Sequence, residues 1–358
     1  MIEHNLISLR FTPGLLKEIL VIDKNLKALG IKTNLYLNKK YKTFFSDEES
    51  TKNIYFIDFF EIIRLIQKTK KLKKADKVSS FFIYNFSIFN LFLFQYLAIF
   101  KPNYKRIYVL HEPFKENPFR LNKSFLKNLI VNYININSSK MITDIVLLSD
   151  YANEIFKSQK QYSSSCRIFN NKIILDPILK NPKKKERIYN TFLGRVTEEK
   201  KINWFLSLAK FCGEKGYKEK FLILSSSNLP ILEIEKINSK YKNLLTINPK
   251  NLDEKTISYY LLLSKSVFIM HKITQSGVFV ESIRHNTPII FKDQISLTKE
   301  MLLCGVSVED LIANNIFNGI KKIENNFDYY QRNCKKIFND KFSSINFIKY
   351  YDFLIKKN

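Results

Sequence analysis

Strand-length apolar runs alternate with longer segments of mixed character through the first half of the chain. The run Asn5–Phe11 is followed by a Pro13-Gly14 turn and by a predicted helix, LLKEILVIDKNLKALG, whose last residue stands at the position of a helix C-cap. Further strands are expected at IKTNLYL, Ile54–Ile57, Ser80–Tyr84, Arg106–Leu110 and Asp144–Leu148. This alternation predicts βαβ units around a parallel sheet.

The chain becomes polar at Asn181–Lys185, which we interpret as an interdomain linker, and a second alternating half follows. Its expected strands are Ile188–Leu193, Phe221–Leu224, Val267–Met270 and Pro288–Phe291. Its expected helices are Lys201–Cys212, Glu254–Ser264 and Gly277–His285, and the tail NDKFSSINFIKYYDFLIKK reads as a last amphipathic helix. Two such halves place a ligand site at the carboxyl ends of their strands.

The uncharged stretch Val78–Phe100 is long enough to be tested as a membrane-spanning helix. It carries several Ser, Asn and Gln residues, and Asn85 falls where a strand would end and a helix begin. A buried strand followed by a buried helix therefore fits better than a membrane span.

Composition narrows the class of protein. A chain of 358 residues with 45% hydrophobic residues is long enough for two globular domains. The four cysteines lie far apart and form no CxxC pair, which speaks against a zinc site or a disulfide framework and suits a reducing cytosol. The first residues show no basic segment leading into an apolar core, so a cytoplasmic protein without a signal peptide is expected.

The net charge is +26, which favours anionic partners such as phosphorylated substrates, an acidic membrane surface or nucleic acid. The densest basic cluster is Lys68–Lys77, directly after the apolar positions of FFEIIRLIQ. An amphipathic helix at an anionic membrane and a core helix followed by a solvated basic turn both explain this pattern. The basic residues are otherwise spread out and no nucleic-acid module is recognisable, so nucleic acid is not an expected partner.

Three short segments carry candidate chemistry. In TFLGRVTEEKK an apolar strand ends at Gly194, and Arg195 and Lys200 then offer a forked and a mobile cation, a pair suited to a diphosphate. In QSGVFVESIRHNTPII, Ser276-Gly277 precedes a helix whose N-terminus can receive an anion, and Glu281 follows one turn later.

The third segment, YVLHEPF, delivers His111 and Glu112 at a strand end, where parallel-sheet sites take their groups. Taken singly, each segment also has a plain explanation: a solvated turn, a surface Glu on an amphipathic helix, or a capping His.

Together these segments resemble retaining GT-B glycosyltransferases, glycosyltransferase family 4 and its relatives. FLGRVTEEKK is similar to the family's FxGRxxxEKG diphosphate motif, and SGVFVESIRHNTPII to its donor-sugar and nucleotide motif. FTPGLLKEILVIDKNLKALGIKTNLYL resembles its opening strand, glycine turn and helix, and YVLHEP its strand-end His. The segments follow one another in the family's order.

The resemblance implies an α/β protein with the GT-B fold, two Rossmann-like domains facing each other across a cleft. Residues 1–180 would bind the acceptor and residues 187–335 the nucleotide sugar, with 336–358 forming a C-terminal helix that packs back toward the first domain. It implies that Arg195 and Lys200 hold the donor diphosphate, that Glu281 binds the ribose and that His111 contacts the donor sugar. The remaining expected binding residues are Gly14, Glu112, Gly194, Thr274, Gln275, Ser276 and Gly277.

The sequence departs from the family at defined positions. Ile273 stands where the family has the first Glu of its E-x7-E pair, and Gln275 is a candidate replacement. Lys201 and Asn286 stand where glycines are usual, and LILSSSN lacks the expected G-x-G. These departures leave the identity of the donor sugar open.

The expected function is transfer of a sugar from a nucleotide-diphosphate donor to a hydroxyl of a glycan or lipid-linked acceptor. No D-x-D occurs in the sequence, and Arg195 and Lys200 would take the place of a divalent metal, so neither a metal nor another cofactor is expected. The resemblance implies retention of configuration and a role in bacterial surface polysaccharide assembly (O-antigen, capsule or lipopolysaccharide). The basic segment Lys68–Lys77 suits peripheral contact with an anionic cytoplasmic membrane and a lipid-linked acceptor. A catalytically inactive partner subunit, a basic nucleic-acid-binding protein and a sugar-phosphate epimerase are the alternatives.

Overall fold

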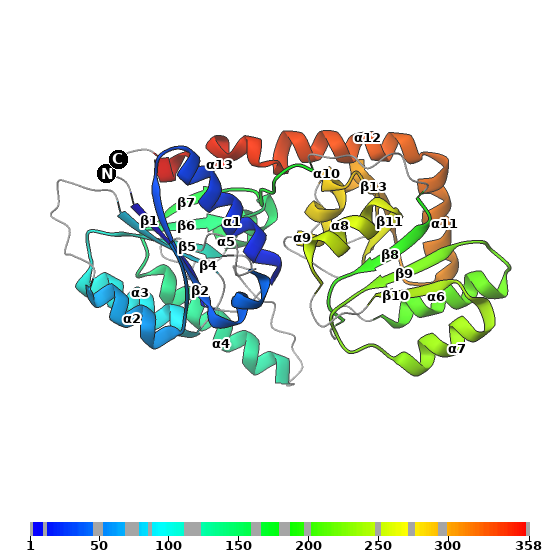
Figure 1. The fold of residues 1–358 in the computed structure, drawn as a ribbon, viewed down its shortest axis with the longest axis horizontal. Helices are drawn as coiled ribbons and strands as arrows, with labels where there is room; N and C mark the ends of the chain where they lie inside the picture. Colours follow the sequence, from blue (N-terminus) through cyan, green and yellow to red (C-terminus); the bar gives the residue numbers. More distant parts are fainter. Residues whose placement is uncertain are drawn as a thin grey trace. The chain divides into compact units, whose positions relative to one another are not determined.

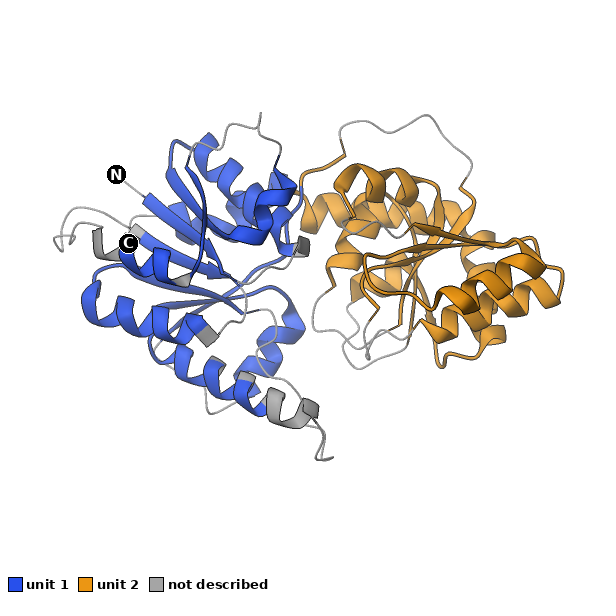
Figure 2. Cartoon of the chain, turned by 60° about the horizontal axis from the view of Figure 1, so that its bottom comes forward, with its two compact units in different colours: residues 1–175, 344–358 blue, residues 176–343 orange. Residues whose placement is uncertain are grey.

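The computed structural model describes residues 3–9, 13–45, 53–68, 79–84, 88–110, 123–158, 166–178, 187–196, 202–247, 252–270, 276–292 and 299–355. The chain divides into two compact units (Figures 1 and 2). Unit 1 comprises Met1–Leu175 together with Ser344–Asn358, and unit 2 comprises Asp176–Ser343.

Unit 1 is built on a seven-stranded parallel sheet in the order β3-β2-β1-β4-β5-β6-β7. Its strands are β1 (Glu3–Ser8), β2 (Lys32–Asn38), β3 (Ile54–Ile57), β4 (Ser79–Tyr84), β5 (Lys105–Leu110), β6 (Asp144–Leu147) and β7 (Arg167–Asn170). Strands buried on both faces tend to carry apolar runs, as in FFIY of β4 and IYVL of β5. Strands β1 and β2 also bury polar residues: His4, Asn5, Ser8, Thr33 and Asn34.

Helices cover both faces of this sheet. One face carries α1 (Pro13–Ala28) and the C-terminal α13 (Phe347–Ile355), which contact each other. The apolar core of the other face includes residues of α2 (Phe59–Lys68), α3 (Ile88–Phe100), α4 (Lys123–Ser139) and α5 (Asp150–Ser158). A short 3-10 helix, η1 (Lys39–Phe44), follows β2. Helix α1 ends as expected, because Gly30 adopts φ 73° and the Ile31 N–H bonds back to the Leu26 carbonyl.

Unit 2 is built on a six-stranded parallel sheet in the order β10-β9-β8-β11-β12-β13. Its strands are β8 (Tyr189–Leu193), β9 (Lys220–Leu224), β10 (Leu244–Ile247), β11 (Ser264–Ile269), β12 (Ile289–Lys292) and β13 (Gly305–Val308).

On one face of this sheet, α6 (Asn203–Glu214), α7 (Ile231–Tyr241) and α11 (Ala313–Asn325) enclose an aromatic-rich core around Phe205, Phe221 and Phe268. Leu261 of α8 (Glu254–Leu262) and Val278 of α9 (Gly277–Arg284) pack with strand residues in a second cluster. Helix α12 (Phe327–Ile337) contacts α9 and α10 (Lys299–Cys304).

The predicted alternation of strands and helices is confirmed in both halves. The segment Val78–Phe100 forms β4 followed by α3, as expected. No described helix is both long enough and apolar enough to cross a membrane. The predicted linker Asn181–Lys185 lies outside the described residues.

The expectation of one continuous C-terminal helix is wrong. After α12 the chain widens into a π-helical turn, Phe338–Phe342, and Ser343 then adopts extended backbone angles. A 3-10 turn, Ser344–Asn346, leads into α13, which is itself kinked at Tyr351. The break occurs where the chain passes from unit 2 to unit 1, because the Ser344 N–H bonds to the Leu175 carbonyl instead of continuing a helix.

Helix α13 is anchored to unit 1 by buried polar contacts. The Nε2 atom of His4 donates to the Leu354 carbonyl at 2.8 Å, and the Tyr351 hydroxyl lies 3.3 Å from Oε1 of Glu18. Phe353 stacks on Phe169 with ring centroids 4.0 Å apart. The last helix is therefore an integral part of the first unit.

Candidate functional site in unit 2

The sheet of unit 2 has a topological switch point between β8 and β11. From β8 the chain moves outward through β9 to β10, then returns to the other side of β8 to form β11 and β12. The loops that follow β8 and β11 therefore leave the sheet in opposite directions. In open α/β sheets, ligands bind beyond the carboxyl ends of the strands at such a point.

The turn after β8 is fixed by glycine geometry and by hydrogen bonds. Gly194 adopts φ 117°, a conformation that side chains disfavour, and its N–H bonds to the Leu224 carbonyl at 2.9 Å. The next residue, Arg195, is exposed. The Val196 N–H then donates to the Ser227 hydroxyl at 3.1 Å. The turn that presents Arg195 is thus tied to the loop after β9.

Helix α9 begins at the carboxyl end of β11 with a side-chain cap. The Ser276 hydroxyl accepts the Phe279 N–H at 3.0 Å, and the Ser276 carbonyl accepts the Val280 N–H at 3.2 Å. Helix geometry leaves the N–H groups of Gly277 and Val278 without an acceptor inside the helix. A methyl group built on Gly277 would meet no described atom within 4 Å. The predicted start of a helix at Gly277 is therefore confirmed, and the backbone at Gly277 is open to close approach.

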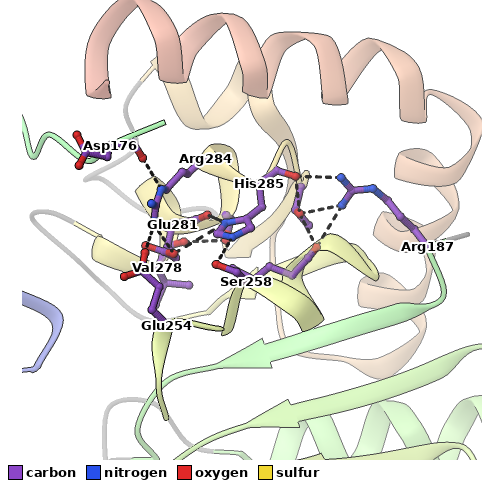
Figure 3. A network of polar contacts seen from close by, with 11 residues as sticks. Asp176, Arg187, Glu254, Ser258, Val278, Glu281, Arg284 and His285 are labelled. Atoms are coloured by element: carbon purple, nitrogen blue, oxygen red, sulfur yellow. Dashed lines mark hydrogen bonds and ion pairs between the residues drawn. The ribbon is translucent and has the colours of Figure 1, made fainter. Parts of the chain in front are cut away.

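Glu281 lies one turn further along α9 and is buried. Its Oε1 atom is 3.2 Å from Nη1 of Arg284 (Figure 3). The same Nη1 atom is 2.8 Å from Glu254 at the start of α8, and Nε of Arg284 donates to the Asp176 carbonyl at 2.6 Å. Arg284 therefore fixes the orientation of the Glu281 carboxylate relative to α8 and to the first residue of unit 2.

His285 follows α9 and is completely buried. Its Nδ1 atom donates to the Glu281 carbonyl at 2.8 Å, and its Nε2 atom lies 2.9 Å from the Ser258 hydroxyl. These bonds hold the C-terminal end of α9 against α8 (Figure 3). Asn286 then adopts φ 54°, a conformation that Asn tolerates better than most residues, which accounts for its use at the helix end.

Arg187 connects the C-terminal ends of α8 and α9. Its guanidinium donates to the carbonyls of Leu261 and Ser264, to the Thr287 hydroxyl and to the His285 carbonyl (Figure 3). Burial lowers the pKa of this guanidinium to about 10, still above neutrality, so it stays charged. Four hydrogen bonds from one side chain lock the ends of α8 and α9 to the start of β8.

Unit 1 has an equivalent switch point between β1 and β4. Gly14 is the second residue of α1, the helix that follows β1. His111 and Glu112 directly follow β5, whose last residue is Leu110, but both lie outside the described residues. Their expected roles therefore remain predictions.

The structure describes six of the predicted site residues: Gly14 in unit 1, and Gly194, Arg195, Ser276, Gly277 and Glu281 in unit 2. Gly194 and Arg195 belong to one side of the unit 2 switch point, and Ser276, Gly277 and Glu281 to the other. Lys200, Thr274 and Gln275 lie outside the described residues, as do His111 and Glu112. Among the described residues, no group of three His, Cys, Asp or Glu side chains is placed to hold a metal ion.

Sequence reasoning missed the residues that hold Glu281 in place. Arg284 and His285 stand three and four positions after Glu281, the spacing that puts residues on one helix face, so a signal for them exists in the sequence. Glu254, Asp176 and Arg187 are distant in sequence and carry no such signal.

Several solved structures of known proteins are similar to this chain over nearly its full length. No protein-family model matches the sequence, and no curated protein matches it either. Sucrose-phosphate synthase from Thermosynechococcus elongatus superposes with a TM-score of 0.71 at 12% identity, covering 99% of both chains. Anabaena HepE in complex with UDP superposes with a TM-score of 0.68 at 11% identity, again covering 99% of both chains. The N-terminal domain of Candida albicans trehalose-6-phosphate phosphatase gives 0.69 at 13% identity, covering 99% of this chain and 96% of that one.

These structures have the GT-B fold, and the likeness extends over nearly the full length of the chain. The protein described here therefore has the GT-B fold, as its sequence motifs led us to expect. At 11–13% identity the likeness concerns the fold alone.

Proposed function

We propose that this protein is a glycosyltransferase that moves a sugar from a nucleoside-diphosphate donor to an acceptor hydroxyl. One observation carries the proposal. In this GT-B fold, the Gly194-Arg195 turn follows β8 and the capped N-terminus of α9 follows β11. Strands β8 and β11 flank the switch point of unit 2. These are also the segments whose sequences resemble the donor motifs of family 4.

Each residue has a role in the proposed donor site. Arg195 and Lys200 neutralise the donor diphosphate, and the N–H groups at the start of α9 add the partial positive charge of a helix N-terminus. Glu281 accepts hydrogen bonds from the ribose hydroxyls, with its carboxylate oriented by Arg284. Thr274, Gln275, Ser276 and Gly277 line the donor sugar and phosphates. His111 contacts the donor sugar, with Glu112 and Gly14 nearby in the first unit.

The proposed reaction breaks the bond between the anomeric carbon and the diphosphate oxygen and forms a bond to the acceptor oxygen. Negative charge develops on the departing diphosphate, and fixed cations there stabilise the transition state more than the ground state. The acceptor proton passes to the departing phosphate, so no separate carboxylate base is required. The proposal includes metal independence, supported by the absence of a D-x-D motif from the sequence and by the cations Arg195 and Lys200. It also includes retention of configuration, supported by the family resemblance.

The structural neighbours suggest which donor to test first. HepE is in complex with UDP and, in a second structure, with UDP-glucose. We therefore propose a uridine-diphosphate sugar as donor. For the acceptor we propose a glycan or lipid-linked substrate of bacterial surface polysaccharide assembly. The basic cluster Lys68–Lys77 lies outside the described residues apart from Lys68, and its contact with the cytoplasmic membrane is part of this proposal.

A thermal-shift screen against UDP, GDP, CMP and dTDP with EDTA present tests the donor site. A ligand that binds only the folded protein raises its melting temperature by mass action. The proposal predicts a shift from UDP that is lost in Arg195→Ala. Arg332→Ala, which removes another exposed arginine of unit 2, is the matched control and should keep the shift. The absence of a shift from all four nucleotides would contradict the donor site.

A second candidate, a catalytically inactive GT-B partner subunit, is favoured by one observation. Ile273 stands where the family carries a sugar-facing Glu. An inactive subunit would either bind no nucleotide or bind it without turnover. Measuring release of UDP from UDP-sugar therefore separates the two candidates.

A further inference from the structure

Helix α3 exposes a row of apolar side chains on the side that faces away from the core of unit 1. The helix has the sequence IFNLFLFQYLAIF and contains no charged residue. Its inner positions, among them Leu93, Phe94 and Leu97, are buried in the core. Its outer positions carry Phe89, Phe92, Ile99 and Phe100, a spacing that places them along one side of the helix.

The neighbouring helix α4 continues this surface. The two helices contact each other, and α4 exposes Leu129, Ile130 and Tyr133. The side chains of Phe92, Ile99 and Tyr133 are 53%, 63% and 65% exposed. Figure 1 shows α3 and α4 on the side of unit 1 away from α1 and α13. We call this surface, formed by the exposed side chains of α3 and α4, the α3–α4 face.

Exposed aromatic and aliphatic side chains that gather on adjacent helices mark a binding surface more often than scattered ones do. The charge of this surface limits what can bind. Neither α3 nor α4 contains an acidic residue, and the charged residues of α4 are Lys123 and Lys127. The chain as a whole carries a net charge of +26.

A second copy of the chain fits this surface poorly, because two molecules of charge +26 repel each other. An anionic bilayer attracts the same charge and accepts apolar side chains at its interface, where aromatic rings are favoured. We propose that the α3–α4 face is a membrane-docking surface that inserts its apolar side chains into an anionic lipid bilayer. The choice of a bilayer rests on the proposed function, which assigns a lipid-linked acceptor.

This surface is distinct from the lysine-rich segment Lys68–Lys77. A basic segment binds through long-range attraction that salt weakens, whereas inserted apolar side chains bind through loss of contact with water, which salt does not weaken. The two contributions can therefore be separated by ionic strength.

Vesicle flotation of the full chain tests the inference. The vesicles contain phosphatidylcholine with or without phosphatidylglycerol, at low and at high salt. We compare the unmodified protein with Phe92→Ser/Ile99→Ser and with the matched control Leu232→Ser, which alters a 77% exposed leucine on α7 of unit 2. Losing two half-exposed apolar side chains should weaken binding to anionic vesicles about tenfold or more, and should remove binding at high salt. Leu232→Ser should bind as the unmodified protein does.

A fluorescence measurement keeps the inference testable if the double variant folds poorly. The single tryptophan of the chain, Trp204, is buried in unit 2. In Phe92→Trp/Trp204→Phe the indole should shift to shorter wavelength and be quenched by brominated lipid when anionic vesicles are added. An unshifted spectrum on vesicle-bound protein would overturn the proposal. So would unchanged flotation of the double variant, or loss of a concentration-dependent dimer in that variant, which would assign the face to a second copy.

Binding of UDP is measured on the same samples. Loss of vesicle binding with intact UDP binding supports the α3–α4 face as a docking surface independent of the donor site. Vesicle binding without UDP binding would leave this inference standing while the proposed donor site fails.

Discussion

Nη1 of Arg284 lies 3.2 Å from the carboxylate of Glu281. Glu281 precedes Arg284 by about one turn of α9. The guanidinium also reaches Glu254 and the Asp176 carbonyl, so its position does not depend on Glu281 alone. This makes Glu281 a suitable target for mutation, because its removal leaves Arg284 with a carboxylate partner. The proposed ribose contact can therefore be tested without leaving a buried, uncompensated charge.

We predict that Glu281→Gln folds and weakens binding of UDP about tenfold. A hydrogen bond to a charged group contributes about 1.5–3 kcal/mol, and the amide lacks the charge and half of the acceptor capacity of the carboxylate. Isothermal titration of UDP against the variant and the unmodified protein measures this change. Glu254→Gln, which alters the other carboxylate held by Arg284, should change the affinity much less.

Gly277→Ala tests whether a ligand approaches the start of α9. The added methyl group meets no described atom within 4 Å, and alanine favours helices over glycine, so the melting temperature should stay the same or rise slightly. If a phosphate contacts the backbone here, the methyl group should lower UDP affinity severalfold. Unchanged affinity in a stable variant would place the phosphate elsewhere.

Arg187→Met should destabilise unit 2 by about 3 kcal/mol or more. The methionine preserves most of the side-chain volume but donates no hydrogen bond, so acceptors at the ends of α8 and α9 lose their partner. Chemical denaturation of the variant measures the change in the free energy of unfolding. Arg332→Met, on the exposed side of α12, should change it by less than about 0.5 kcal/mol.

Glu18 makes the stability of unit 1 depend on pH between about 4.5 and about 8. Burial between α1 and α13 raises the pKa of this carboxyl from 4.5 to about 8, while the hydrogen bond from Tyr351 opposes the rise. The folded protein therefore binds a proton that the unfolded chain has lost, and stability should fall as pH rises from about 4.5 to about 8. Glu18→Gln should remove this slope and raise the melting temperature at pH 8. An unaltered pH profile in that variant would contradict a neutral Glu18.

His4 acts in the opposite direction at the acid end. Burial lowers its pKa from 6.5 to about 4, so the folded protein binds fewer protons than the unfolded chain in this range. The stability associated with neutral His4 is present above pH 6.5 and is lost as pH falls toward 4. Glutamine does not titrate, so His4→Gln should flatten the loss of stability between pH 6.5 and about 4. The decline that Glu18 causes above pH 6.5 should stay in place.

The sequence predicts the central strands of both sheets and misses three short ones. β7, β10 and β13 each have four residues and lie at sheet edges. Central strands are covered by helices on both faces and need continuous apolar runs, whereas an edge strand such as Arg167–Asn170 remains largely exposed and needs no such run. Strand β7 therefore carries no apolar run, whereas β3, also at a sheet edge, carries the run IYFI and is predicted.

The same distinction explains what sequence reasoning found at the site. The helix start after Ser276 and the Gly194 turn are local features, set by residues within a few positions of one another, and both are present. The partners of Arg284 are not local, since Asp176 lies 108 positions away and Glu254 lies 30 positions away. Only the folded unit brings them together.

Turnover of a UDP-sugar in the presence of EDTA tests whether this protein is a metal-independent glycosyltransferase. The purified protein is incubated with radiolabelled UDP-sugars and bacterial membranes, and label in the lipid and polysaccharide fractions is measured together with free UDP. We predict transfer of label that needs no metal, is lost in Arg195→Ala and persists in Arg332→Ala. Binding of UDP without transfer of label or release of UDP from any donor would contradict it and identify a GT-B protein that binds nucleotide without catalysis.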